Sequence, residues 1–166
     1  GLTLDIVFGN WQKNVHKHTL ILYANGGKLT GSDERTADYG TQIKLSDMAT
    51  ASKTDDLRDY IFGGWKDEDG NIYGADDIIT LTKDTTLTAV WKNGAYKEYT
   101  ITFVLDSKTI KRVTYHYGDA LPTFGAPEEA DGYIFGGWSW FGTEGALSGQ
   151  PDTMPASTLT AIGTTT

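Results

Sequence analysis

A hexapeptide that occurs twice limits what this chain can fold into more than any other feature. Residues 60–65 and residues 133–138 both read YIFGGW. Repetition at a spacing of this size is typical of a chain that builds one small structural unit more than once. The 166 residues are enough for two small units.

Three further landmarks recur in the same order around the hexapeptide. The matched segments are 19–22 with 100–103, 39–40 with 117–118, and 86–89 with 158–161. The separation between matched segments shrinks along the chain, which places extra residues in the first copy, mainly between Gly40 and Tyr60. We therefore predict two homologous modules, at residues 17–95 and 96–166.

The first residues carry a trace of a third copy. Residues 3–8 follow the pattern of residues 86–91, and a polar segment comes after both. We expect residues 1–16 to hold the last strand of a preceding repeat followed by a linker. On this interpretation the chain is cut from a longer array.

Short β-prone segments bounded by Gly, Asn and Asp dominate the pattern, which predicts a mostly β protein of the α+β class. Examples are residues 19–23, 86–91, 99–104 and 112–117. Helical periodicity is weak, and we expect only a short helix within residues 44–57 and a brief turn near residues 127–130. In residues 86–90, Leu87 and Ala89 should share one face of a strand.

Turn residues and the repeated hexapeptide define the expected frame of each module. Asn25-Gly26 and Asp106-Ser107 predict hairpin turns, as does Asp69-Gly70. The Gly pair between Phe and Trp predicts a bulge or a close backbone approach. We interpret the hexapeptide as core, with a ligand groove as the alternative. The core-motif residues are Tyr60, Phe62, Gly63, Gly64 and Trp65 in copy one and Tyr133, Phe135, Gly136, Gly137 and Trp138 in copy two.

Together these landmarks resemble the Listeria–Bacteroides repeat, also called the internalin B-repeat. Its pattern is a strand with a D/N-G turn, a Y-G step, G-Y-x-F-x-G-W, an M-P-A segment and a T-L-T-A-x-W strand. Copy two carries residues 117–118, 132–138 and 154–161 of this pattern, and copy one carries residues 25–27, 39–40, 60–65 and 86–91. Copy one departs from it at Asp59 and at residues 81–84, and copy two lacks the closing Trp after Ala161.

The resemblance covers about residues 18–162 and implies a small ubiquitin-like β-grasp fold for each module. It implies an extracellular location on a bacterial cell surface or cell wall. It also implies that the repeats act as a stalk or spacer and as units that interact with a host. The family pattern carries no catalytic residue to transfer.

Composition excludes several other classes of function. The chain has a net charge of −8 and no cluster of Lys and Arg, which disfavours nucleic-acid binding. No apolar run approaches the roughly 18 residues of a membrane span, so we expect no membrane insertion. There is no cysteine and hence no thiolate metal site or disulfide.

The sequence offers weak candidates for chemistry, and each has a simpler explanation. His16 and His18 could share a face of a strand, but no third zinc ligand lies nearby. Residues 67–71 read DEDGN, which suits a hairpin turn and lacks the spacing of a calcium loop. No nucleophile or phosphate-binding motif occurs. We expect no cofactor, no metal site and no enzymatic activity.

Aromatic residues outside the landmarks are the candidates for binding. Trp140 and Phe141 follow the second hexapeptide, and an exposed pair there could stack on a sugar or anchor a protein. Trp11 and Tyr96 are expected to pack between successive modules. The partners we expect are neighbouring repeats and a host glycan or surface protein. A carbohydrate- or mucin-binding module and an accessory region of an extracellular enzyme are the alternatives.

Overall fold

In the computed structural model, β-strands make up most of the chain and form two five-stranded sheets within the described residues. The structure describes the backbone of residues 2–7 and 10–166, and side chains from residue 16 onward. The strands group into two compact units. The first consists of Gly1–Thr54 and Tyr60–Gly94, and the second of Asp55–Asp59 and Ala95–Thr166.

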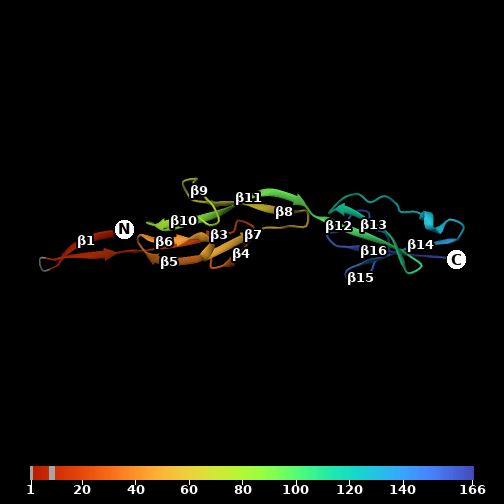
Figure 1. Ribbon diagram of the computed structural model, residues 1–166, viewed down its shortest axis with the longest axis horizontal. Coiled ribbons are helices and arrows are strands. Elements are labelled where there is room, and N and C mark those ends of the chain that lie inside the picture. Colours follow the sequence, from red (N-terminus) through yellow and green to blue (C-terminus); the bar gives the residue numbers. More distant parts are fainter. Residues whose placement is uncertain (1, 8–9) are drawn as a thin grey trace. The chain divides into compact units, whose positions relative to one another are not determined.

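The first sheet has a parallel pair at its centre. Its strands, in spatial order, are β5 (Glu34–Asp38), β3 (Lys17–Tyr23), β11 (Thr85–Tyr96), β8 (Arg58–Lys66) and β9 (Ile72–Tyr73) (Figure 1). β3 runs antiparallel to β5 and parallel to β11. Parallel neighbours cannot be joined by a tight turn, so the chain between them crosses over one face of the sheet.

Alternation along β3 and β11 builds the core of the first unit. Leu20 and Leu22 of β3 and Leu87 and Ala89 of β11 point to the buried face. This confirms the shared face predicted for Leu87 and Ala89. The crossover covers this face with Ile43, Leu45, Met48, Ala49, Ile79 and Leu81, and Trp65 completes the core.

The crossover is built from short elements rather than from one helix. They are β6 (Thr41–Lys44), α1 (Leu45–Met48), β7 (Ala49–Ser52) and β10 (Ile78–Leu81). β6 pairs with β10, and β7 pairs with β4 (Lys28–Gly31), both antiparallel. The helix expected within residues 44–57 is therefore a single turn, because the residues after Met48 pair with β4 instead.

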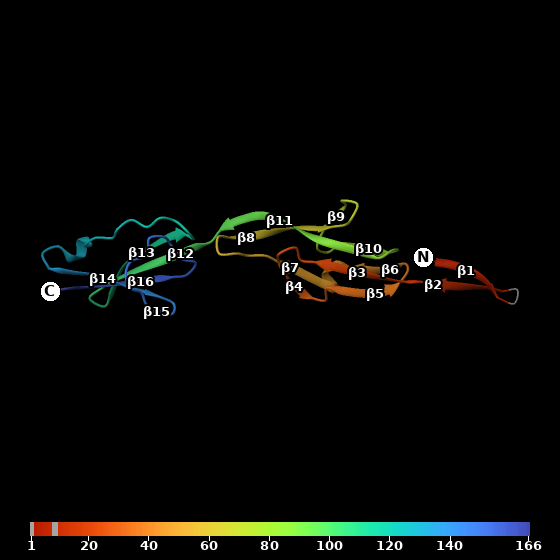
Figure 2. The same ribbon diagram turned by 180° about the vertical axis from the view of Figure 1, so that it is seen from behind.

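The second sheet repeats the strand order of the first. Its strands, in spatial order, are β13 (Lys108–His116), β12 (Glu98–Leu105), β16 (Leu159–Thr165), β14 (Phe135–Gly142) and β15 (Gly145–Ala146) (Figure 2). β12 runs antiparallel to β13 and parallel to β16. The core comprises Ile101, Phe103, Trp140, Met154, Leu159 and Ala161.

A shared backbone hydrogen bond shows how closely the two frames agree. In the first unit, Gly40 N–H donates to the carbonyl of Leu81 at 2.8 Å. In the second, Gly118 N–H donates to the carbonyl of Met154 at the same distance. Leu81 and Met154 are both fully buried. The Y-G step of each copy thus ties its hairpin to the segment before the last strand, although the two segments differ in sequence.

Two strands near the start of the chain form a separate two-stranded sheet. β1 (Leu2–Val7) pairs antiparallel with β2 (Asn10–Val15) over the whole length of both strands. The polar segment expected to be a linker therefore contains a strand. The Trp11 side chain, expected to pack between modules, lies outside the described side chains.

The predicted turns form where Gly, Asn and Asp tolerate positive φ. Asn25 and Gly26 have φ of 52° and 86°, and Asp106 and Ser107 have φ of 48° and 68°. Gly70 also has positive φ, and its N–H donates to the carbonyl of Asp67. The 3-10 turn Glu128–Ala130 matches the turn expected near residues 127–130.

The two YIFGGW segments differ in burial. Trp65 is 1% exposed and Phe62 packs against it, as the core interpretation predicts. In the second unit, Trp138 is only partly buried, and Tyr133 is 65% exposed. The core assignment of Tyr133 is therefore wrong, because Tyr133 lies before the strand that begins at Phe135.

The backbone conformation explains why the motif contains glycine. Gly64 and Gly137 adopt φ of 113° and 92°, and the ladder of β14 with β16 is irregular between Phe135 and Trp138. This irregularity fits the predicted bulge.

The two copies of the motif offer a matched test of glycine. A Cβ at Gly64 would lie 2.7 Å from the Ile72 side chain and 2.8 Å from the Tyr73 carbonyl oxygen, whereas a Cβ at Gly137 would meet nothing within 4 Å. Both Gly→Ala changes should cost about 1–2 kcal/mol from positive φ. Gly64→Ala should cost clearly more, as measured by urea unfolding followed by NMR. Equal losses would contradict the steric explanation.

Candidate functional site

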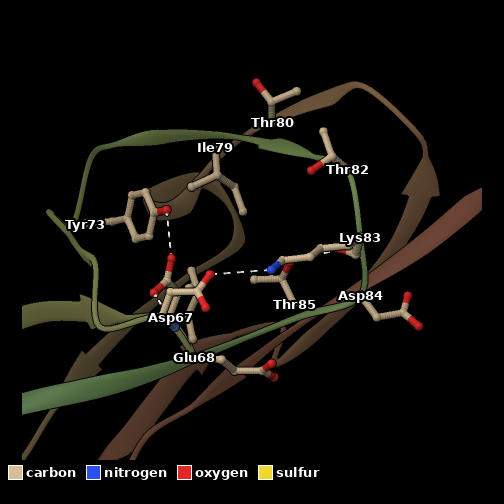
Figure 3. A pocket seen from close by; sticks show the side chains of 11 residues that line it. Asp67, Glu68, Tyr73, Ile79, Thr80, Thr82, Lys83, Asp84 and Thr85 are labelled. Carbon is tan, nitrogen blue, oxygen red and sulfur yellow. Dashed lines mark hydrogen bonds and ion pairs between the residues drawn. The ribbon is translucent and has the colours of Figure 1, made fainter. Parts of the chain in front are cut away.

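A small pocket lies beside the β8–β9 hairpin of the first unit. Its volume is about 110 Å³, and Figure 3 shows its side chains. The lining residues are Asp67, Glu68, Asp69, Tyr73, Ile79, Thr80, Thr82, Lys83, Asp84, Thr85 and Leu87. The acidic residues come from the DEDGN run and from the turn before β11. The pocket thus gathers the carboxylates that suggested a calcium loop.

Asp67 is the organising residue of this hairpin. Its Oδ1 accepts the backbone N–H groups of Asp69 and Asn71 at 2.9 and 2.8 Å. Its Oδ2 accepts the Asn71 side-chain amide at 3.0 Å. The same oxygen accepts the Tyr73 hydroxyl at 3.1 Å (Figure 3). A carboxylate that receives four donors from its own turn holds the turn closed.

These hydrogen bonds also set the protonation of the pair. The Asn71 side-chain amide holds the pKa of Asp67 below its usual value, and further donors from Asn71, Tyr73 and Asp69 act in the same direction. The hydrogen bond to Asp67 raises the pKa of Tyr73, because loss of the phenolic proton would place a second negative charge beside the carboxylate.

Two more carboxylates near the pocket have partners within the chain. Asp69 lies 3.5 Å from the Lys83 ammonium. Asp84 accepts the Thr19 backbone N–H at 2.9 Å and lies 3.5 Å from Nδ1 of His18. The contacts of these carboxylates therefore stabilise the loops of the first unit. This structural role accounts for Asp67, Asp69 and Asp84.

The described side chains form no cluster suited to a metal ion. Among residues 16–166, no group of three or more His, Asp and Glu side chains has the required arrangement. The DEDGN run forms the hairpin turn that its letters also suit. His116 stacks on Tyr96 with ring centroids 5.2 Å apart, and its backbone N–H donates to Asp119.

Trp140, expected to be an exposed binding residue, lies in the core of the second unit. It is 5% exposed and packs against Phe103 and Phe124 at centroid distances of 6.0 and 5.9 Å. The expected exposed pair with Phe141 therefore does not form. Consecutive strand residues point to opposite faces, so burial of Trp140 turns Phe141 outward, where it stays partly exposed.

Tyr96 also has a defined place within the second unit. Its ring packs against His116 and lies 4.3 Å from the guanidinium of Arg58. The backbone near it is tied by a bond from Lys97 N–H to the Leu57 carbonyl. The expectation that Tyr96 packs between modules remains a prediction.

A second, larger pocket escaped the sequence interpretation. It has a volume of about 470 Å³ and is lined by Phe103, Ile110, Lys111, Phe124, Gly125, Ala126, Pro127, Glu128, Glu129 and Trp138. Trp138 donates its indole N–H to the Gly125 carbonyl at 3.0 Å and so holds one wall. The sequence feature that could have predicted this pocket is the different length of the two copies between the Y-G step and the hexapeptide.

Copy two lacks the closing Trp of the repeat, and this difference explains why Trp138 takes its position in the pocket wall. In the first unit, Trp91 fills the space beside Phe62 and donates to the Ala24 carbonyl. The matching position in the second unit is Gly163, and a Cβ there would lie 2.8 Å from Phe135 and 2.9 Å from Trp138. The rings of the second hexapeptide therefore occupy the space that Trp91 fills in the first.

Comparison with known proteins identifies the family of these units. The model of the Listeria-Bacteroides repeat domain matches residues 18–90 and 99–161, most of the chain. The chain therefore belongs to the Listeria-Bacteroides repeat family, as its sequence landmarks predict.

A relative from Evansella cellulosilytica named "Putative membrane protein" is 28% identical over 134 residues. The match covers 80% of this chain and 18% of the relative, so the chain spans about a fifth of that protein. No solved structure matches the chain. Among residues 2–7 and 10–166, no helix is long and apolar enough to cross a membrane.

Burial of Trp140 gives a stability prediction. Trp140→Ala should destabilise the second unit by about 3–5 kcal/mol, because it removes a large buried ring and leaves a cavity. Phe141→Ala should cost much less, because Phe141 is partly exposed. Urea unfolding followed by NMR signals of each unit measures both. Similar small losses would contradict the core position of Trp140.

Asp67 gives a pH prediction. Its folded pKa is lowered, so the stabilisation is present above the unfolded pKa and is lost as pH falls through the folded pKa. Asp67→Ala should lower the Tm of the first unit at pH 7, and its difference from wild type should shrink in acid below about pH 4. Glu68→Ala, an exposed neighbour, is the control. A pH-independent difference would contradict this role.

Proposed function

We propose that this chain is a non-catalytic repeat segment of a secreted or wall-attached bacterial surface protein. It acts as a stalk or spacer and also presents surfaces for interaction with a host. The observation that carries the proposal is the double match to the repeat family, together with the same strand order in both sheets. A repeat family typical of bacterial surface proteins and a relative named as a membrane protein support this location.

We further propose that each unit is a β-grasp module, with boundaries at residues 17–95 and 96–166. The support is a mixed sheet whose first and last long strands are parallel central neighbours, with the crossover on one face. The division of the chain near residue 95 supports this boundary, whereas Asp55–Asp59 group with the second unit and residues 1–16 group with the first.

A spacer is defined by its length and stability rather than by a particular surface. The test places the chain between a wall anchor and an epitope on a Gram-positive cell and measures antibody-bead access to the epitope. Deletion of both units should reduce access, and an unrelated module pair of equal length should restore it. Failure of the unrelated pair to restore access would contradict a pure spacer role.

Carbohydrate or mucin binding is the competing proposal, and it loses its main aromatic candidate because Trp140 is buried. Phe141→Ala is the suitable variant, since it alters a partly exposed ring. Binding to a panel of immobilised glycans and mucins that is lost in Phe141→Ala would favour the adhesive role. Under the spacer proposal, wild type and variant should both fail to bind.

A further inference from the structure

The two units differ in the strand that follows the first hairpin turn, which in the first unit lies outside the five-stranded sheet and pairs with β7 alone. In the first unit, the chain turns at Asn25-Gly26 into β4, and β7 pairs with β4 in the register Leu29↔Ala51 and Thr30↔Thr50. β7 places Ala49 and Ala51 against the core. The backbone that follows the first hairpin turn is therefore covered by a strand from the same unit (Figure 1).

The matching backbone of the second unit lacks this cover. The chain turns at Asp106-Ser107 into β13, and Ile110 follows that turn at the same distance as Leu29 follows Asn25. Leu29 and Ile110 are both partly buried against their cores. β13 is the terminal strand of its sheet, and no other strand of the described chain pairs with its outer edge.

The sequence explains why no internal strand covers β13. Residues 41–59 separate the Y-G step from the hexapeptide in copy one, whereas the shorter segment 119–132 does so in copy two. The shorter segment contains Pro122 and Pro127, which lack the N–H needed in a strand ladder. It contains an isolated bridge at Ala120 and the turn Glu128–Ala130. Figure 2 shows the rest of this connection as a chain without strands.

A groove with both apolar and charged lining residues includes part of this strand. Ile110 and Lys111 of β13 line the 470 Å³ pocket described above, together with the rings of Phe124 and Trp138. Phe103 also lines it and contacts Phe124 and Trp138 at centroid distances of 4.9 and 5.1 Å. Unpaired backbone groups and apolar pockets for alternate side chains are what added strands use for binding.

The charged residues of β13 indicate which class of partner this groove suits. β13 carries the exposed basic residues Lys108, Lys111 and Arg112 in a chain with a net charge of −8. A second copy paired through the same edge would bring these cations together, which disfavours self-association. Of these three cations only Lys111 lines the groove, and Glu128 and Glu129, which lie outside β13, line it as well. An occupant should therefore place its acidic residues on the β13 side of the groove.

We propose that the second unit binds an extended acidic peptide segment of a partner protein as an added antiparallel strand on β13 at residues 108–111. The peptide takes the place that β7 holds in the first unit. Small or apolar side chains enter the groove at alternate positions, and acidic residues lie beside Lys108, Lys111 and Arg112. This inference goes beyond the spacer role, because a spacer needs no peptide groove.

The test uses the 166-residue chain labelled with ¹⁵N and a capped peptide of sequence EATASE, which copies β7 between glutamates. NMR shifts should saturate at residues 109–111 and 124–129 and at the Trp138 indole. A peptide of sequence KATASK should bind at least tenfold more weakly, because its charges face Lys108 and Lys111. Shifts confined to other residues, or no saturable shifts, would overturn the proposal.

Backbone and side-chain controls separate strand addition from loose contact. N-methylation of alternate peptide amides should abolish binding in one register and preserve it in the other, because only one set of amides faces β13. Lys111→Glu should weaken binding of EATASE roughly fivefold or more. Lys28→Glu, at the covered edge of the first unit, should leave binding unchanged. Equal binding by both methylated peptides, or equal losses in both variants, would contradict strand addition.

Discussion

The parallel pairing of the first and last long strands is the constraint on which each unit depends. β3 lies beside β11 and β12 lies beside β16, so each module can close only after the intervening chain has crossed over the sheet. The crossover brings the apolar residues that bury the faces of these strands. Leu81 and Met154 occupy equivalent buried positions in the two crossovers. The segments before the last strand can therefore differ in sequence while the fold of the two units stays the same.

The crossovers are also where the two units diverge in structure. The longer one of the first unit supplies β7, which pairs with β4 and leaves Ala49 buried. The shorter one of the second unit contains two prolines and leaves the outer edge of β13 without a strand from the described chain. Two repeats that share a strand order can thus differ in what their crossovers cover.

Local sequence signals predicted the features that depend on a few neighbouring residues. The turns at Asn25-Gly26, Asp69-Gly70 and Asp106-Ser107 form because those residues tolerate positive φ, and Leu87 and Ala89 share a face because strands alternate. The helix within residues 44–57 was overestimated. The residues after Met48 instead form hydrogen bonds with β4, and these tertiary contacts outweigh a weak helix propensity.

The sequence by itself determined the family, the two copies of the frame, the turns and the glycines of the hexapeptide, because each rests on local backbone chemistry or on repetition. Only the tertiary structure decided which aromatic ring fills each core. Trp65 is buried in one unit, whereas Trp140 is buried in the other and Trp138 lies over Gly163. The two identical hexapeptides differ in burial because burial depends on the residues across the sheet. The second copy has Gly163 at the position where the first has Trp91.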